Sequence, residues 1–266
     1  MSVLRRSVRY IPALAVLGVV TADAQVTALE FREDRAVKER VFHYVKSNVD
    51  GSHAGEISVF VADGTRIESL KKWGTADRRA TLVVAEMDWP RFSVRSFAAW
   101  ELSCNEPPVP KATLQASADG RELAISVIDQ PVRLSHWPWH SYDFDFASLS
   151  LVLPHRRDPR AEFVFWRTDF IFDDPPRFGE LGEVRLVFET TEKRHGKPAH
   201  RYSISGPGLE NTQGKWWSDP DTGLLVEFEI PIPDEPGYKD VRLRLQGSQA
   251  MTTDEWTALK RAAVCE

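Results

Sequence analysis

Apolar and polar residues alternate along most of this chain. Between residues 183 and 189, Val184, Leu186 and Phe188 fall on one side of the pattern, and charged residues dominate the other. Successive side chains of a β-strand point to opposite faces of a sheet, so this alternation predicts strands with one apolar and one polar face. The same pattern recurs at 41–46, 56–62, 66–71, 81–87, 92–100, 113–117, 122–128, 162–166, 201–205, 226–230 and 241–245.

Short turn signals separate these segments. Asp63-Gly64 and Asp119-Gly120 are tight-hairpin dipeptides, because these residue types tolerate positive φ. Slightly longer hairpin loops are expected at 195–196 and 221–223. Short hairpins make neighbouring strands antiparallel. The sequence therefore predicts a mainly β fold, a curved antiparallel sheet or half-barrel meander with helices against its concave face, and a β-sandwich is the alternative.

A helix is expected at the C-terminal end of the chain. Thr252 and Glu255 have the spacing of a capping box, and an apolar stripe that begins at Trp256 follows them. We expect this helix to pack on the apolar face of the sheet. A first helix is expected over residues 29–38.

The N-terminal residues have the order of a secretory signal peptide. Three arginines between positions 5 and 9 precede an uncharged apolar run at 11–20, and Ala22-Asp23-Ala24 follows as a small-x-small cleavage site. The apolar run is shorter than the roughly 20 residues that a membrane-spanning helix needs. We therefore expect residues 1–24 to be a signal peptide, with cleavage after Ala24 and export to the periplasm.

Residues 25–266 are expected to form a single β-rich domain, since no linker, repeat or low-complexity tract divides them. This part of the chain contains 31 basic and 38 acidic residues, a net charge of −7. Nucleic acids and anionic membrane surfaces bind concentrated basic faces, so this balance argues against both as partners. No apolar stretch after residue 24 approaches membrane-spanning length.

The sequence contains two cysteines, Cys104 and Cys265. In an oxidising compartment they can form a disulfide, which would tie a loop to the C-terminal helix. Two unpaired thiols are the alternative, because Cys265 is the penultimate residue. Neither cysteine comes directly after the apolar run of the signal peptide, so no thiol is placed to carry the lipid anchor of a lipoprotein.

The segment 136–146 has the most unusual composition, with five aromatic residues, two histidines and two aspartates. Imidazole and carboxylate groups can bind a divalent metal or act as acid and base. His140, Asp143 and Asp145 are therefore the candidate catalytic residues.

An extended conformation offers a second interpretation of the same segment. The aromatic residues at 142, 144 and 146 would then share one face, opposite the two aspartates. This arrangement predicts an aromatic plug in the core, with the acids facing water or nearby arginines such as Arg156 and Arg157. The chain has no nucleophile elbow, phosphate-binding glycine-rich loop, His-Glu-x-x-His or Cys-x-x-Cys motif, and we expect no cofactor.

The last third of the chain carries a family resemblance. A charged strand, a Gly-Lys hairpin and a second strand occupy residues 192–204, and Trp216, an Asp-x-x-Gly turn and an outgoing strand follow up to residue 226. This order resembles the C-terminal meander of uncharacterised exported proteobacterial β-proteins, a domain of unknown function. It is more distantly similar to the half-barrel of the periplasmic lipoprotein carriers and their outer-membrane receptor. These motifs are structural, so the resemblance implies a fold and no catalytic residue.

Export, strand alternation and this resemblance together predict a soluble periplasmic binding or carrier-like protein. Its ligand would be a lipid or another apolar molecule, held between the concave sheet face and the C-terminal helix. A metal-dependent or acid–base enzyme of the cell envelope is the second hypothesis, and a structural or interaction module of an envelope assembly is the third. The residues expected to line the ligand site are Phe92, Val94, Trp100, Val184, Leu186, Phe188, Phe228 and Leu243.

Overall fold

A computed structural model describes residues 28–73, 78–171, 174–233 and 235–265. The expected signal peptide and its cleavage site lie outside these residues. Fifteen strands and two α-helices are present in the described chain. The strands are β1 (Arg40–Ser47), β2 (Gly55–Val61), β3 (Arg66–Trp73), β4 (Arg79–Asp88), β5 (Ser93–Ser103), β6 (Val109–Ala116), β7 (Glu122–Ile125), β8 (Ile128–Arg133), β9 (Trp139–Ser141), β10 (Phe163–Ile171), β11 (Arg177–Arg194), β12 (Lys197–Ser205), β13 (Gln213–Ser218), β14 (Leu225–Ile230) and β15 (Val241–Ala250). The α-helices are α2 (Ala147–Val152) and α3 (Thr253–Cys265), and short 3-10 turns are η1 (Glu33–Arg35), η2 (Leu153–His155) and η3 (Pro207–Leu209).

All fifteen strands belong to one sheet, in the order β8-β7-β6-β5-β4-β3-β2-β1-β15-β14-β13-β12-β11-β10-β9. The order consists of two meanders, β1 to β8 and β9 to β15, which are joined where β1 pairs with β15. The pairs are antiparallel except that β9 runs parallel to β10. The expected curved antiparallel sheet is confirmed, and the alternative of a β-sandwich does not form.

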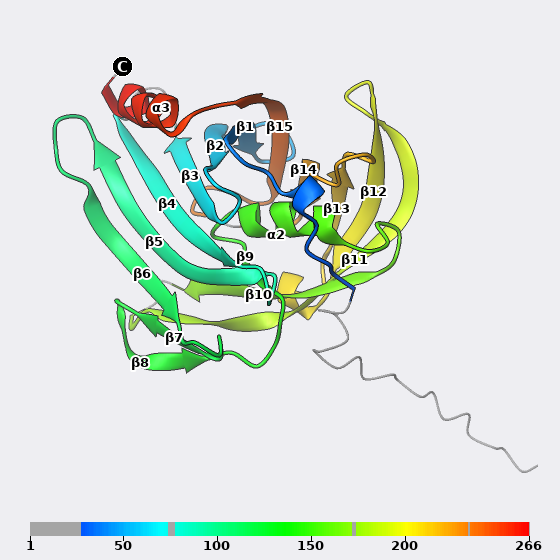
Figure 1. The fold of residues 1–266 in the computed structure, drawn as a ribbon, viewed down its shortest axis with the longest axis horizontal. Coiled ribbons are helices and arrows are strands. Elements are labelled where there is room, and N and C mark those ends of the chain that lie inside the picture. Colours follow the sequence, from blue (N-terminus) through cyan, green and yellow to red (C-terminus); the bar gives the residue numbers. More distant parts are fainter. Residues whose placement is uncertain (1–27, 74–77, 172–173, 234, 266) are drawn as a thin grey trace, which may run out of the picture.

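The sheet rolls around its own interior, and its two ends approach strands far along the order. β8 lies against β11, and β9 lies against β5. Figure 1 shows α2 inside this roll, with strands around it. A sheet with one apolar face must hide that face, and rolling allows one sheet to do so around a small central element. The largest apolar cluster of the described chain fills this interior.

Local sequence explains which face each strand residue occupies and where the strands turn. In β1, Phe42 and Tyr44 point into the interior cluster, and Val41 belongs to a separate cluster on the other face. Gly64 and Gly120 adopt φ of 85° and 72°, the left-handed conformation that these hairpin turns require. His195 and Gly196, both with positive φ, form the two-residue connection between β11 and β12.

The C-terminal helix α3 forms as expected, but it packs on the outer face of the sheet. Thr252 and Glu255 make the capping box, with the Thr252 amide donating to the Glu255 carboxylate at 2.7 Å. The ring of Trp256 stacks on Phe60 at 5.2 Å, and its indole N–H donates to the buried carboxylate of Glu68. The expectation of a concave site for α3 was wrong. The reason is a second apolar patch on the outward positions of β1 to β4, made of Val41, Phe60, Leu70, Ala80 and Leu82.

The expected first helix over 29–38 is reduced to the three-residue turn η1. The residues that precede η1 bind the chain around η2 instead of forming helical bonds. Leu29 forms a β-bridge with Arg156, and the Glu30 amide donates to the His155 carbonyl at 2.9 Å. Backbone bonds to a distant loop therefore replace the bonds of a helix here. Within the described residues, no helix is long and apolar enough to cross a membrane.

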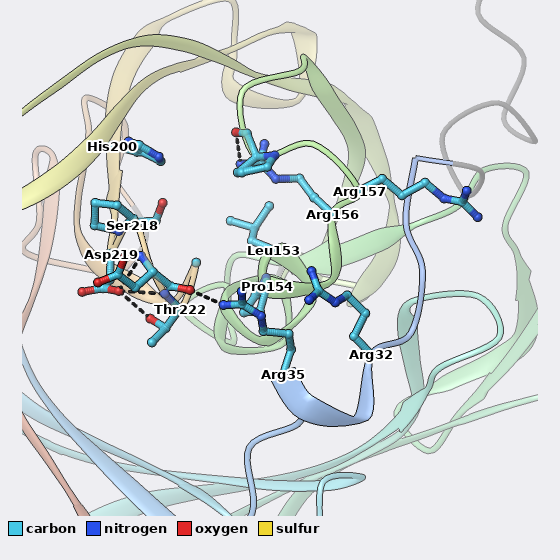
Figure 2. A pocket seen from close by; sticks show the side chains of 14 residues that line it. Arg32, Arg35, Leu153, Pro154, Arg156, Arg157, His200, Ser218, Asp219 and Thr222 are labelled. Atoms are coloured by element: carbon cyan, nitrogen blue, oxygen red, sulfur yellow. Dashed lines mark hydrogen bonds between the residues drawn. The ribbon is translucent and has the colours of Figure 1, made fainter.

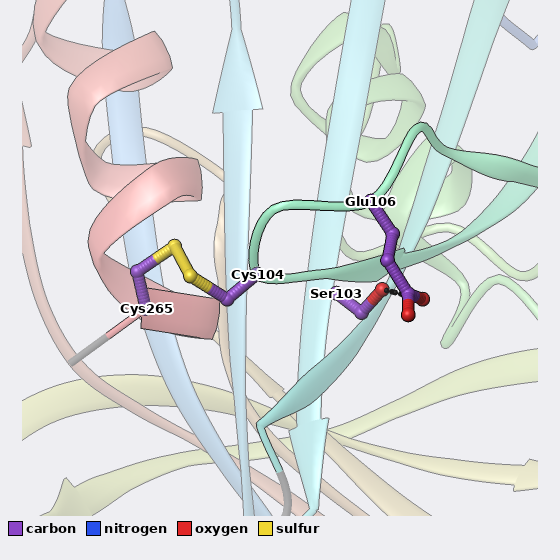
Figure 3. Close-up of a disulfide and its surroundings, with 4 residues drawn as sticks. All are labelled: Ser103, Cys104, Glu106 and Cys265. Atoms are coloured by element: carbon purple, nitrogen blue, oxygen red, sulfur yellow. Dashed lines mark hydrogen bonds between the residues drawn. A yellow bond between two sulfur atoms is a disulfide. The ribbon is translucent and has the colours of Figure 1, made fainter.

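Cys104 and Cys265 form a disulfide across a sequence separation of 161 residues, which confirms the paired alternative. Figure 3 shows it joining the end of α3 to the chain that follows β5. In the same loop, the Ser103 hydroxyl donates to Glu106 at 2.7 Å. The disulfide and the Trp256 contact hold α3 to the outer face near its two ends.

Removal of the disulfide should destabilise the protein. The double variant Cys104→Ala/Cys265→Ala is expected to lose about 2–5 kcal/mol of unfolding free energy, because the cross-link closes a long loop in the unfolded chain. Urea denaturation of the variant and of the oxidised protein measures this difference. Treatment with a reductant should lower the stability of the wild-type protein to that of the variant and leave the variant unchanged; equal stability of all forms would contradict the prediction.

Candidate functional site

The segment 139–152 crosses the interior of the roll, and we call it the plug. It begins with β9 and ends with α2, and all six residues of α2 are buried. The rings of Tyr142 and Phe146 stack at 5.1 Å, and Phe146 meets Phe228 of the sheet at 6.3 Å. The expected aromatic plug in the core is present, but residues 142–146 form turns and not the expected extended segment, so Asp145 is buried along with the rings.

The plug conformation depends on its surroundings. Asp145 and Phe146 adopt φ of 50° and 51°, in the left-handed region. Such conformations cost about 1–3 kcal/mol each for residues other than glycine. The helix α2 has only six residues and no side-chain cap on its first turn. A helix of this length is not stable alone in water, so tertiary contacts must hold the plug in place.

A buried ion cluster supplies the strongest of these contacts. Lys46 of β1 and Lys71 of β3 place their ammonium groups 2.7 Å from the two carboxylate oxygens of Asp145. Glu235, in the β14–β15 connection, lies 3.3 Å from the Lys46 nitrogen and 3.7 Å from that of Lys71. Lys71 also donates to the main-chain carbonyl of Asp143 at 2.5 Å. We call Lys46, Lys71, Asp145 and Glu235 the ion cluster.

The electrostatic environment keeps Asp145 ionised. Burial alone would raise the pKa of this carboxyl, whose residue is 1% exposed, but the charges of Lys46 and Lys71 and their hydrogen bonds outweigh it and lower the pKa below its usual value. A second carboxylate, Asp169, has the opposite balance. Burial raises its pKa despite Arg167 and the hydrogen bonds from the Asp143 amide and Ser141.

The candidate catalytic residues have separate structural partners. His140 is completely buried, its Nδ1 lies 2.9 Å from the Ser148 hydroxyl, and burial lowers its pKa to about 3. Asp143 accepts the Phe170 amide at 2.8 Å, and Asp145 belongs to the ion cluster. The described residues include no group of three or more His, Cys, Asp or Glu side chains placed to hold a metal ion.

For Asp145, the expectation that these acids face water, Arg156 or Arg157 was wrong. Asp145 is buried and pairs with two lysines, and Asp143 binds the backbone of β10. The cause is the direction of the plug, which turns into the roll after β9 and carries its acids with it. Arg156 and Arg157 lie instead beyond η2, at the other end of the plug.

The residues expected to line a ligand site separate into three groups. Phe188 is half-buried at the edge of the interior cluster, with its ring 5.7 Å from that of Tyr202. Trp100 packs against the outer cluster beneath α3 and does not join the others. The remaining six are buried together in the interior cluster: Phe92, Val94, Val184, Leu186, Phe228 and Leu243.

The ion cluster was not predicted, although the sequence contains a signal for it. Lys46 continues the inward phase of Phe42 and Tyr44, and Lys71 continues that of Ile67. A lysine at an inward position of a strand must find a buried partner, because an unpaired charge in an apolar interior is very unfavourable. Two such lysines on β1 and β3 therefore predict an internal carboxylate. The sequence does not indicate that Asp145 provides it.

Comparisons with known proteins give distant structural neighbours. No protein-family model and no curated protein matches the chain. A β-barrel-like protein of Domain of Unknown Function DUF1849 from Brucella abortus aligns with 8% identity and a TM-score of 0.40, over 79% of this chain and 96% of that chain. A lipoprotein-sorting domain from Vibrio parahaemolyticus aligns with 11% identity and a TM-score of 0.21, over 91% of this chain and 100% of that chain. The expected resemblance to a domain of unknown function, and more distantly to lipoprotein carriers, is confirmed.

Breaking the ion cluster should be strongly destabilising. Asp145→Asn removes the carboxylate that lies 2.7 Å from both Lys46 and Lys71 and leaves the more distant Glu235, and we expect a loss of about 3–5 kcal/mol of unfolding free energy. Glu122→Gln is a matched control, because it breaks the surface pair of Glu122 and Arg133, whose side chains are 46% and 83% exposed. The control should change stability by less than about 1 kcal/mol. Urea denaturation measures both, and equal effects would contradict a structural role for the cluster.

The lowered pKa of Asp145 predicts how this difference depends on pH. A carboxyl with a lowered folded-state pKa stabilises the protein above its unfolded pKa, and the contribution is lost as pH falls through the folded value. The stability gap between wild type and Asp145→Asn should therefore be constant between pH 7 and pH 5 and shrink below about pH 4. Denaturation curves across this range measure the gap. Shrinkage that begins near neutral pH would show that the pKa is raised instead.

Proposed function

We propose that this chain is an exported binding protein whose interior takes up a lipid or another apolar ligand in place of the plug. The observation that supports the proposal most is the plug itself. The inner wall of the roll is apolar apart from Lys46, Lys71 and a few small polar residues, and what covers it is a short segment with two residues in the left-handed region and an uncapped helix of six residues.

The plug makes apolar contacts that a ligand could replace. Leu149 and Val152 of α2 are fully buried in the same cluster as Leu186, Phe228 and Leu243 of the wall. An acyl chain buries about 0.8 kcal/mol per methylene group. A chain of about 14 carbons would thus gain on the order of 10 kcal/mol, more than the about 3–5 kcal/mol expected for loss of a buried ion pair. The gain exceeds the ion-pair term, and it must also offset the apolar burial that the side chains of the plug lose when they leave the interior.

The ion cluster stabilises the closed form, in which the plug fills the interior, and determines how much free energy opening requires. The ammonium groups of Lys46 and Lys71 hold Asp145, two residues before α2 begins. When the plug moves out, these charges keep Glu235, which lies outside the plug in the β14–β15 connection. The cluster therefore sets the free energy of opening without making opening prohibitive.

Export rests on two features of the chain. The Cys104–Cys265 disulfide belongs to an oxidising compartment, and the basic-apolar-small order of residues 1–24 is typical of a signal peptide. We propose a periplasmic protein that consists of the single domain 25–266 after cleavage at Ala24.

Weakening the ion cluster should increase affinity for an apolar probe. If only the open form binds, the apparent Kd is the intrinsic Kd divided by the open fraction. Asp145→Asn should then bind cis-parinaric acid at least tenfold more tightly than wild type, measured by the probe's fluorescence under conditions where the variant is folded by circular dichroism. Glu122→Gln should bind as wild type does. Equal affinity of wild type and Asp145→Asn would exclude displacement of the plug.

The rim of the interior offers a second test. Phe188→Glu puts a carboxylate at the half-buried position that joins the interior cluster, and it should reduce cis-parinaric acid binding at least tenfold while the fold remains. Val187→Glu is the matched control, because Val187 is the preceding residue of the same strand, is 38% exposed and points to the other face. Circular dichroism and the fluorescence titration measure fold and binding. Global unfolding of Phe188→Glu would show that this residue is core and lines no site.

A further inference from the structure

A cavity lies where the plug ends, on the side of η2. It has a volume of about 180 Å³ and is lined by four parts of the chain: the N-terminal segment around η1, the residues from Leu153 to Pro159, His200 of β12, and the end of β13 with the turn that follows it. Figure 2 shows Arg32, Arg35 and Arg156 among its side chains, with His200 and Ser218 on the side opposite Arg156. Arg157 also contributes to the lining, but its side chain extends away from the others.

Three of the four arginines have partners near the surface. Arg32 donates to Asp34 at 3.2 Å, Arg35 donates to the main-chain carbonyl of Asp221, and Arg157 lies 3.7 Å from Glu30. The side chains of Asp34 and Glu30 are 66% and 58% exposed, so water screens these pairs strongly.

Arg156 differs from them, because it is 5% exposed and forms no ion pair with a described carboxylate. Its Nη2 donates to the Tyr202 hydroxyl at 2.8 Å and to the carbonyl of Pro159 at 2.5 Å, and its guanidinium lies 4.9 Å from the centre of the Tyr202 ring. The Nε and Nη1 atoms of Arg156 have no hydrogen-bond partner among the described residues. No carboxylate of the described residues forms an ion pair with its guanidinium. The hydrogen-bond acceptors of this buried cation are therefore neutral oxygens, and the nearby charge of Asp158 acts on it without forming an ion pair.

A guanidinium remains protonated in proteins, so burial does not neutralise Arg156. A buried charge requires a partner of opposite charge, and two free N–H donors of a planar guanidinium fit two oxygens of a carboxylate or a phosphate. The lining holds four arginines and two aspartates, Asp219 and Asp221, and Arg32 and Arg157 are paired with the exposed carboxylates of Asp34 and Glu30. The carboxylate of Asp219 is already used within its own turn, where it accepts the amide of Thr222 at 2.8 Å.

We propose that this cavity binds a phosphate monoester, with Arg156 as the buried anchor and Arg32 at the rim. A phosphate monoester carries close to two negative charges near neutral pH, and its oxygens can accept from the free donors of Arg156 and replace the exposed Asp34 as the partner of Arg32. The volume of about 180 Å³ is several times the about 30 Å³ of one water molecule, so it accommodates a phosphoryl group and part of its ester. His200, whose Nδ1 lies 2.8 Å from the Thr191 hydroxyl, lies on the opposite wall.

The site is independent of the interior ligand, since it rests on charge and the interior on apolar contacts. The phosphate could belong to a soluble phosphorylated molecule or to the headgroup of a phospholipid. Both sources present the same chemistry to Arg156. The experiment must therefore separate them.

Isothermal titration calorimetry with glycerol 3-phosphate tests the site directly. Wild type should bind one equivalent, Arg156→Gln should lose at least tenfold in affinity, and Arg32→Gln, which alters a half-exposed side chain, should lose about threefold. Arg133→Gln removes an arginine whose side chain is 83% exposed and that does not line the cavity, so it should bind as wild type does. Arg32→Gln keeps the test valid if Arg156→Gln fails to fold.

Sedimentation with vesicles of phosphatidic acid in phosphatidylcholine provides the second arm. Binding of both glycerol 3-phosphate and vesicles, each reduced by Arg32→Gln, would support the site with a lipid headgroup as its source. Binding of glycerol 3-phosphate alone would support the site with a soluble source. Binding of vesicles alone would overturn the proposal, as would no binding of glycerol 3-phosphate at 10 mM or equal binding by wild type, Arg32→Gln and Arg133→Gln.

Discussion

The contact between the plug and the wall of the roll depends on one ionic interaction, the pairing of Asp145 with Lys46 and Lys71. It joins the plug to β1 and β3, two strands of the first meander. Without it, two lysines would be buried in an apolar interior without the counter-charge of the plug. The plug would also keep the left-handed residues that precede its helix without the contact that holds them. The closed structure thus follows from a charge requirement as much as from apolar burial.

The rolled sheet explains why such a plug is needed. Fifteen strands in one sheet present a large apolar face, and the two ends of the sheet lie against other strands without pairing with each other in the described chain. Side chains of the wall alone do not fill this interior, and the plug supplies aromatic rings and aliphatic side chains to its centre. On the outer face, α3 covers a smaller apolar patch and is fixed by a disulfide. The two helices are therefore attached differently: a covalent bond cross-links α3 to the sheet, and only non-covalent contacts hold α2.

Sequence reasoning predicted the repeating part of this structure well and the irregular part poorly. The alternation around Val184, Leu186 and Phe188 predicts a strand because each side chain depends only on the face it occupies. The capping box at Thr252 is similarly local. The face that α3 covers is not local, because it depends on outward apolar positions of four different strands. The plug is the extreme case, since its conformation is imposed by Lys46 and Lys71, about 100 and 74 residues earlier in the chain.

Hydrogen–deuterium exchange of the plug tests the central claim most directly. The protein would be labelled with and without a saturating amount of cis-parinaric acid, and the peptide that contains residues 142–152 compared with peptides from β2 and β12. If the ligand takes the place of the plug, deuterium uptake of 142–152 rises in its presence while uptake of the two strands stays low. Unchanged or slower exchange of 142–152 in a ligand-bound sample would contradict the account, because the plug would then remain in the interior.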